Sequence, residues 1–139
     1  MSFRERSTVL MLAVLLGVYG WYFIHIYRLA RISEVNEISY QPLLLVMVLV
    51  LVALSAIGHI VIAMLPSYEG DQSDERDTLI SLKGERVGGI VLALGTLSGL
   101  FLAMAEFPAF WIAHALLAGL VLAELISGAV KLISYRRMA

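Results

Sequence analysis

Five ionisable residues lie within or beside long apolar runs, and they are the residues best placed for chemistry: His25, His59, Glu106, His114 and Glu124. A charged side chain at the centre of a bilayer costs roughly 2.5 kcal/mol or more, so such a residue needs a partner, an interface or a function. Counting along the apolar runs separates the five residues into two levels, one near each membrane surface.

His59 and Glu124 form the inner level. Each lies about 17 residues, or ~25 Å, from the outer start of its own apolar run. The two side chains are therefore candidates for an intramembrane polar pair. Three interpretations remain open for it: a structural hydrogen bond between two spans, a proton-titrating site in a transporter, or a Glu124 that snorkels to the cytoplasmic interface.

His25, Glu106 and His114 form the outer level, where we expect the side chains to meet water and lipid headgroups. Their types would also suit zinc, and His25 with His114 would suit a b-type haem. No two of them have a local spacing such as i, i+4, so we expect neither a metal nor a cofactor. We also expect no catalytic role, since no nucleophile–base pair, phosphate-binding glycine loop or paired carboxylates occur.

The composition indicates a membrane protein. Of the 139 residues, 60% are hydrophobic and 15% are charged, whereas soluble domains are nearer half apolar and a quarter charged. The net charge of −1 leaves no basic patch for nucleic acid. The absence of cysteine excludes disulfides, thiolate metal sites and a catalytic thiol.

Four apolar runs predict an all-α, four-helix transmembrane bundle as a single domain over residues 1–139. Each run is near the ~20 residues that cross a bilayer, and only helices satisfy the backbone there. Lysine and arginine gather on one side, which predicts cytoplasmic N and C termini. The predicted spans cover residues 7–29, 42–65, 87–105 and 107–131.

Small residues at helical spacing predict how the spans pack, because close backbone approach drives association in lipid. Either these stripes join the third and fourth spans, or one of them is a homodimer face. Four helices bury few faces completely, so we expect a homo-oligomer, most simply a dimer. The stripes are Gly95, Gly99 and Ala103 in the third span and Ala115, Gly119, Ala123 and Ser127 in the fourth.

The polar segment 73–86 separates the second and third spans. Its acids precede its bases, which predicts a cytoplasmic helix starting near Ser73 or Asp74. This helix either continues into the third span or hinges at the glycines 84–89. The segment is either a solvated connector or a docking surface for a partner. The candidate docking residues are Asp74, Glu75, Arg76, Asp77, Lys83, Glu85 and Arg86.

The order D-E-R-D-x-x-I from Asp74 to Ile80, followed by K-G-x-R and by Gly88 at the start of a span, resembles a group of small bacterial membrane proteins without an assigned activity. The resemblance covers about residues 74–95. It implies a bacterial inner membrane and a regulatory or docking role. Small multidrug transporters match less well, because their essential glutamate lies in the first span.

Together these features predict a small, non-enzymatic membrane protein that acts through self-association or through a cytoplasmic or membrane partner. The alternative is a proton-coupled small-molecule transporter or channel component that uses Glu124 and His59. We expect the lipid bilayer and such protein partners, but no cofactor and no nucleic acid.

Overall fold

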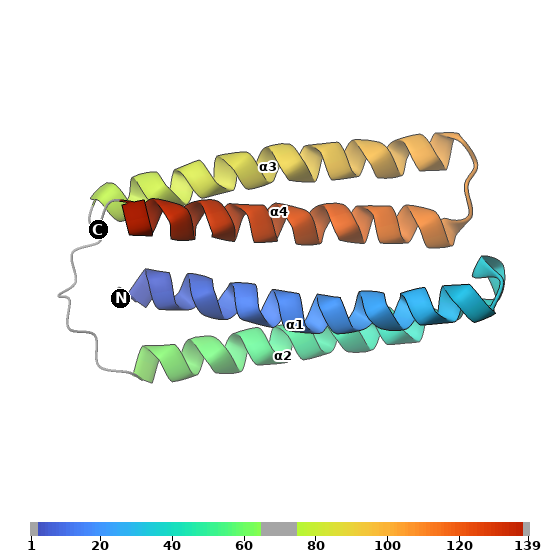
Figure 1. Ribbon diagram of the computed structural model, residues 1–139, viewed down its shortest axis with the longest axis horizontal. Coiled ribbons are helices and arrows are strands. Elements are labelled where there is room, and N and C mark those ends of the chain that lie inside the picture. The colour runs from blue at the N-terminus through green and yellow to red at the C-terminus, as the bar shows by residue number, and fades with distance from the viewer. Residues whose placement is uncertain (1–2, 65–74, 138–139) are drawn as a thin grey trace.

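The computed structural model is all-helical and describes residues 3–64 and 75–137. Its four long helices are each apolar enough to cross a membrane (Figure 1). This confirms the predicted all-α architecture with four spans. In chain order the elements are α1 (Phe3–Ile32), the short 3-10 helix η1 (Val35–Glu37), α2 (Gln41–Met64), α3 (Glu75–Met104) and α4 (Ala109–Arg137).

The helices extend beyond the predicted spans at most of their ends, because a helix continues past the hydrocarbon into charged residues. The clearest case is α3, which runs unbroken from Glu75 through the glycines 84–89 to Met104. Of the two predicted geometries, the continuous helix is therefore the one observed. Glu75 and Asp77 lie in its first turn, where carboxylates favour the positive end of the helix dipole. Ser73 and Asp74 lie outside the described residues.

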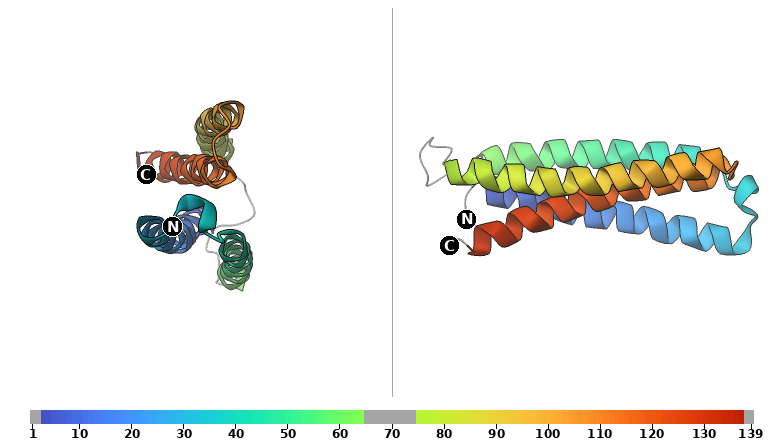
Figure 2. Two further views of the ribbon diagram at one scale, coloured as in Figure 1. Left: turned by 90° about the vertical axis from the view of Figure 1, so that its right-hand side faces the viewer. Right: turned by 90° about the horizontal axis from the view of Figure 1, so that it is seen from above.

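The helices form a row rather than a square. Viewed end-on, the order is α3, α4, α1, α2 (Figure 2). The most extensive contacts join α3 to α4, and α1 contacts both α4 and α2. The two outer helices are therefore poorly covered: 6% of the apolar window of α2 is buried and 11% of that of α3, against 22% in α1 and α4.

Close backbone approach builds the α3–α4 hairpin. A Cβ atom added to Gly95 would lie 2.5 Å from the Cα atom of Gly119, and one added to Gly88 would lie 2.9 Å from the Cβ atom of Ser127. The connecting turn is tight, with Glu106 at a φ of 56° and the Phe107 amide donating to the Leu102 carbonyl at 3.0 Å. The helix α4 starts at Ala109, two residues after the predicted start of the span.

Most of the small residues in the two predicted stripes lie at the contact between α3 and α4. Gly99 meets the side chain of Leu116, and an added Cβ on Gly88 would also lie 3.0 Å from the Ala123 carbonyl. Ala115 is half-buried and Ala103 is exposed. The stripes thus join α3 to α4 within one chain over most of their length.

The buried apolar core lies on the other side of α4 and is centred on α1. Tyr22 is fully buried there, and α2 contributes Met47 while α4 contributes Phe110 and Val121. The core therefore ties α4 to α1 and, more loosely, α1 to α2.

Candidate functional site

A polar cavity of about 180 Å³ lies at the end of the bundle where α1 begins and α4 ends. Side chains from α1, α2 and α4 line it, and His59 and Glu124 are both among them. The structure therefore brings the two predicted inner residues to one site. Its polar lining consists of Ser7, Thr8, His59, Glu124, Ser127 and Lys131.

Helical spacing explains the lining contributed by α4. Glu124, Ser127 and Lys131 follow each other at i, i+3 and i+7, which places them on one face. Gly128 borders the same cavity and allows α1 to approach, since an added Cβ would lie 2.6 Å from the Leu12 side chain. The close α1–α4 contact closes one side of the cavity.

Both ring nitrogens of His59 make hydrogen bonds. Nδ1 donates to the Ser55 carbonyl at 2.7 Å, and the Ser7 hydroxyl donates to Nε2 at 2.9 Å. A carbonyl only accepts, so this arrangement requires a proton on Nδ1. The His59 side chain thus links α2 to α1, and not α2 to α4 as one of the three interpretations of the His59–Glu124 pair expected.

Glu124 borders the cavity without a hydrogen bond or an ion pair to any residue in the described ranges. The buried Tyr19 faces it from α1 within electrostatic range. The ammonium of Lys131 instead lies 3.4 Å from Glu85 Oε1 on α3. The Glu124 side chain is exposed, and its carboxylate has no direct partner among the described residues.

The Lys131–Glu85 ion pair lies near the start of α3. The Ser81 hydroxyl also donates to Glu85 Oε1, at 2.8 Å. The Ser81 hydrogen bond, and after it the Lys131 charge, hold the pKa of Glu85 below its usual value. Among the other predicted docking residues in the described ranges, Arg76 and Asp77 are half-buried, whereas Glu75, Lys83 and Arg86 are exposed.

At the opposite end of the bundle, His114 is buried among aromatic rings. Its Nδ1 donates to the Phe110 carbonyl at 2.7 Å, and the Tyr22 hydroxyl donates to its Nε2 at 3.0 Å. The Phe110 ring stacks on the imidazole at a centroid distance of 4.1 Å, and the Tyr40 ring meets it edge-on at 5.2 Å. This histidine is a structural link between α1 and α4.

The predicted outer cluster does not form. His25 is exposed and stacks on Trp21 at a centroid distance of 5.6 Å, while Glu106 lies in the α3–α4 turn. Within residues 3–64 and 75–137, no group of three potential ligands is close enough to hold a metal ion. His114 also has no free nitrogen for a metal or a haem, so the geometry does not support either alternative.

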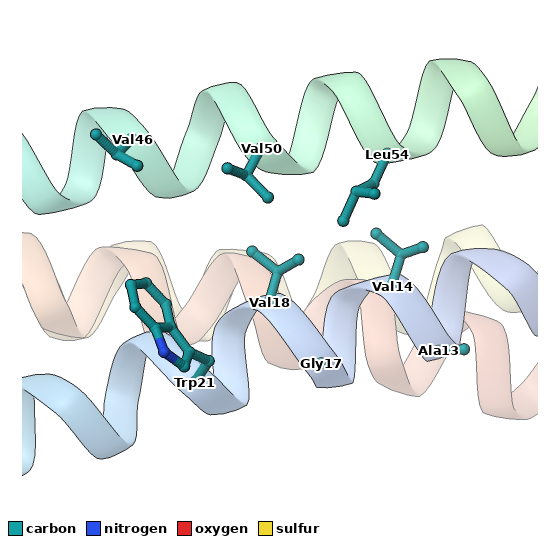
Figure 3. Close-up of a pocket in the computed structure, with 8 residues that line it drawn as sticks. All are labelled: Ala13, Val14, Gly17, Val18, Trp21, Val46, Val50 and Leu54. Carbon is teal, nitrogen blue, oxygen red and sulfur yellow. The ribbon is translucent and has the colours of Figure 1, made fainter.

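The residues that sequence reasoning missed are the hydroxyl partners Ser7 and Tyr22, together with an apolar cleft between α1 and α2. The cleft measures about 580 Å³ and opens between the two helices (Figure 3). The exposed glycine in the middle of α1, Gly17, was the available signal for it. The cleft is lined by Ala13, Val14, Gly17, Val18, Trp21, Val46, Val50 and Leu54.

No family model, curated protein or solved structure matches the chain. The polar cavity and the apolar cleft beside α1 are therefore the candidate functional features of the chain. The similarity of the segment 74–95 to small bacterial membrane proteins stays a prediction.

Proposed function

We propose that this is a small, non-enzymatic protein of the bacterial inner membrane that acts by association through the exposed face of α1 and α2. The observation that carries the proposal is the uneven burial of the spans, with only 6% of the apolar window of α2 covered. Beside that exposed helix lies the cleft of about 580 Å³. Self-association as a dimer is the simplest use of this face.

The composition of the cleft supports a helix as its occupant. Ala13 and Gly17 lie on its α1 side, and an added Cβ on Gly17 would meet no atom within 4 Å. In lipid, small residues favour helix association because they allow backbones to approach. The α3–α4 hairpin already uses glycines in this way, at Gly95 and Gly119.

The proposed orientation has both termini in the cytoplasm, because lysine and arginine gather at the end of the bundle where both termini lie. The first three turns of α3 would then project towards the cytoplasm with Lys83 and Arg86 exposed. These turns are the candidate surface for a cytoplasmic partner.

Cysteine crosslinking tests the association, and the natural chain has no cysteine to interfere. Single cysteines at Val46, Val50 and Leu54 should give covalent dimers in native membranes when a short bifunctional thiol reagent is added. Leu94 on α3 is the matched control, since it is 62% exposed and lies away from the cleft. Dimers of equal yield at Leu94, or no crosslinks at any cleft position, would contradict the proposal.

A second variant separates dimerisation from binding of a different protein. Gly17→Leu fills the cleft and should abolish the crosslinked dimer. Crosslinks from the cleft positions to a protein of another mass, in place of the dimer, would assign the face to a different membrane partner.

The second candidate function is proton-coupled transport of a small molecule, as a transporter or channel component. The observation favouring it is the shared cavity of His59 and Glu124. Reconstituted vesicles with a proton gradient test it. Glu124→Gln should abolish the flux, and flux that survives this substitution, or no flux in the natural protein, would exclude the transporter.

A further inference from the structure

We propose that the cleft between α1 and α2 binds an anionic phospholipid, with one acyl chain in the cleft and the phosphate at Arg28. The lipid belongs to the leaflet opposite the end where α1 begins and α4 ends. This site follows from the geometry of a single chain. The proposed association uses the same cleft, so the lipid competes with the partner helix, and this regulatory role rests on the proposed function.

The cleft matches one leaflet of hydrocarbon in length and in polarity. Its lining runs from Ala13 and Leu54 at one end to Trp21 and Val46 at the other (Figure 3). Ala13 and Trp21 are eight residues apart, or ~12 Å along the helix, and half of the hydrocarbon core of a bilayer is ~15 Å thick. Apart from the indole nitrogen, the lining side chains carry no polar atom. An acyl chain therefore fits the cleft.

Three nitrogen-bearing side chains continue the line of the cleft towards the end of α1. Trp21, His25 and Arg28 follow one another at i, i+4 and i+7, which places them on one face of the helix. All three are exposed, and the Trp21 and His25 rings stack at a centroid distance of 5.6 Å. Each carries at least one N–H donor. This face of α1 thus changes from apolar to cationic in the order in which a phospholipid changes from acyl chain to phosphate.

The Arg28 guanidinium is the group that selects an anion. Side chains on an α-helix tilt towards its N-terminus, which directs Arg28 back towards His25 and the cleft. Among the described residues Arg28 makes no ion pair, whereas the Lys131 ammonium lies 3.4 Å from Glu85 Oε1. A guanidinium binds a phosphate through two parallel hydrogen bonds. A phosphate therefore supplies the counter-charge that Arg28 lacks.

An anionic lipid suits this arrangement better than a free anion or a zwitterionic lipid does. A free anion would leave the apolar cleft of about 580 Å³ unfilled. A zwitterionic headgroup brings its own cation, which reduces the attraction between its phosphate and Arg28. The net negative charge and the acyl chain are both needed to match the two parts of the site.

Quenching of tryptophan fluorescence by brominated lipids tests the site. The chain has two tryptophans, Trp21 and Trp111, so Trp111→Phe leaves only the reporter beside the cleft. In phosphatidylcholine vesicles, we expect dibrominated phosphatidylglycerol to reach half-maximal quenching at an about five-fold lower mole fraction than dibrominated phosphatidylcholine, the preference that one arginine confers near a membrane surface. Equal quenching curves for the two lipids would overturn the anionic site.

Trp21→Phe gives the matched control, which reports on Trp111 alone. Trp111 is 46% exposed and lies in the first turn of α4, near the same end of the bundle (Figure 1). No lysine or arginine follows it in α4 before Lys131. We expect the two lipids to quench Trp111 equally. A preference of the same size at both tryptophans would indicate general enrichment of the anionic lipid and overturn the site.

Substitutions at Arg28 and Gly17 test the two parts of the site separately. Arg28→Gln should abolish the preference at Trp21, and Arg28→Lys should keep part of it. Gly17→Leu fills the cleft and should also abolish the preference, whereas Gly89→Leu should not, since a Cβ on Gly89 also meets no atom within 4 Å but lies on α3. An undiminished preference in Arg28→Gln would overturn the phosphate position, and one in Gly17→Leu would overturn the acyl-chain position.

The lipid site and the proposed association can fail separately. A phosphatidylglycerol preference at Trp21 without crosslinks at Val50→Cys would exclude the dimer and support the lipid site. Crosslinks without the preference would exclude the lipid site and support the dimer. Where both occur, the crosslinking yield at Val50→Cys should fall as phosphatidylglycerol replaces phosphatidylcholine, and an unchanged yield would overturn the competition for the cleft.

Discussion

The α3–α4 hairpin and the α1–α2 hairpin solve the same packing problem in different ways. The first closes by backbone contact, with a Gly95 Cβ position 2.5 Å from Gly119. The second stays open along the apolar cleft and is linked near its end by the Ser7–His59 hydrogen bond of 2.9 Å. Spaces that can hold a ligand or a partner helix occur along α1, where the packing is incomplete.

The largest expected effect comes from breaking the closed hairpin. Gly95→Ala places a methyl group against the Gly119 backbone, which has no flexible side chain to move aside. Overpacking of this kind costs about 1–3 kcal/mol. Unfolding in mixed detergent and dodecyl sulfate, followed by circular dichroism, should show this loss of stability.

Gly89→Ala is the control for that substitution. It lies on the same helix with no atom within 4 Å of its Cβ position, and alanine gains about 1 kcal/mol over glycine in a helix interior. We therefore expect unchanged or higher stability. Equal destabilisation by the two variants would mean that the glycine contact is not what holds α3 against α4.

The next effect concerns the link between the two hairpins. Tyr22→Phe removes the hydrogen bond of 3.0 Å to His114 Nε2 and leaves that buried nitrogen without a partner. An unsatisfied buried acceptor costs about 1–3 kcal/mol. The same unfolding assay measures the loss, and Tyr27→Phe should change little because Tyr27 is 65% exposed. Two equal responses would contradict the structural role of His114.

A smaller effect is expected within the open hairpin. Ser7→Ala removes the hydrogen bond to His59, whose side chain is already exposed to the cavity. The loss of stability should be about 0.5–1 kcal/mol. Because Nε2 becomes free, diethylpyrocarbonate should modify His59 faster in this variant, while the buried His114 reacts slowly in both proteins. An unchanged rate at His59 would argue against the Ser7 bond.

The smallest effect is a pH dependence at the polar end of the closed hairpin. The Ser81 hydrogen bond and the Lys131 charge lower the pKa of Glu85 in the folded protein. The stabilisation is therefore present above the unfolded value of 4.5 and is lost as the pH falls through the lower folded value. Glu85→Gln should flatten the acid side of the stability profile. A steeper profile in the variant would reverse the assigned sign.

The spans were predictable because bilayer thickness and backbone hydrogen bonding leave few alternatives for four long apolar runs. The predicted third and fourth spans, 87–105 and 107–131, leave one residue between them, so the α3–α4 hairpin was predictable as well. Depth along a helix also placed His59 and Glu124 at one level. The helix order and the rotation of each helix were not predictable, because apolar residues surround every span.

The hydrogen-bond partners of His59 and His114 were not predictable, because the order and rotation of the helices determine them. Ser7 lies 52 positions from His59, and Tyr22 lies 92 positions from His114. Both contacts depend on α1 lying between α4 and α2, which no local spacing indicates. For the same reason, depth alone grouped His25 with His114, although their side chains face different surroundings.

The short turn between α3 and α4 determines the register of the hairpin. Glu106, at a φ of 56°, reverses the chain within the few residues between Met104 and Ala109. One added residue there would rotate the following helix by about 100° relative to α3. Gly119 would then leave Gly95, and Glu124 would turn away from α1. A surface turn therefore controls the position of a carboxylate at the far end of the same helix.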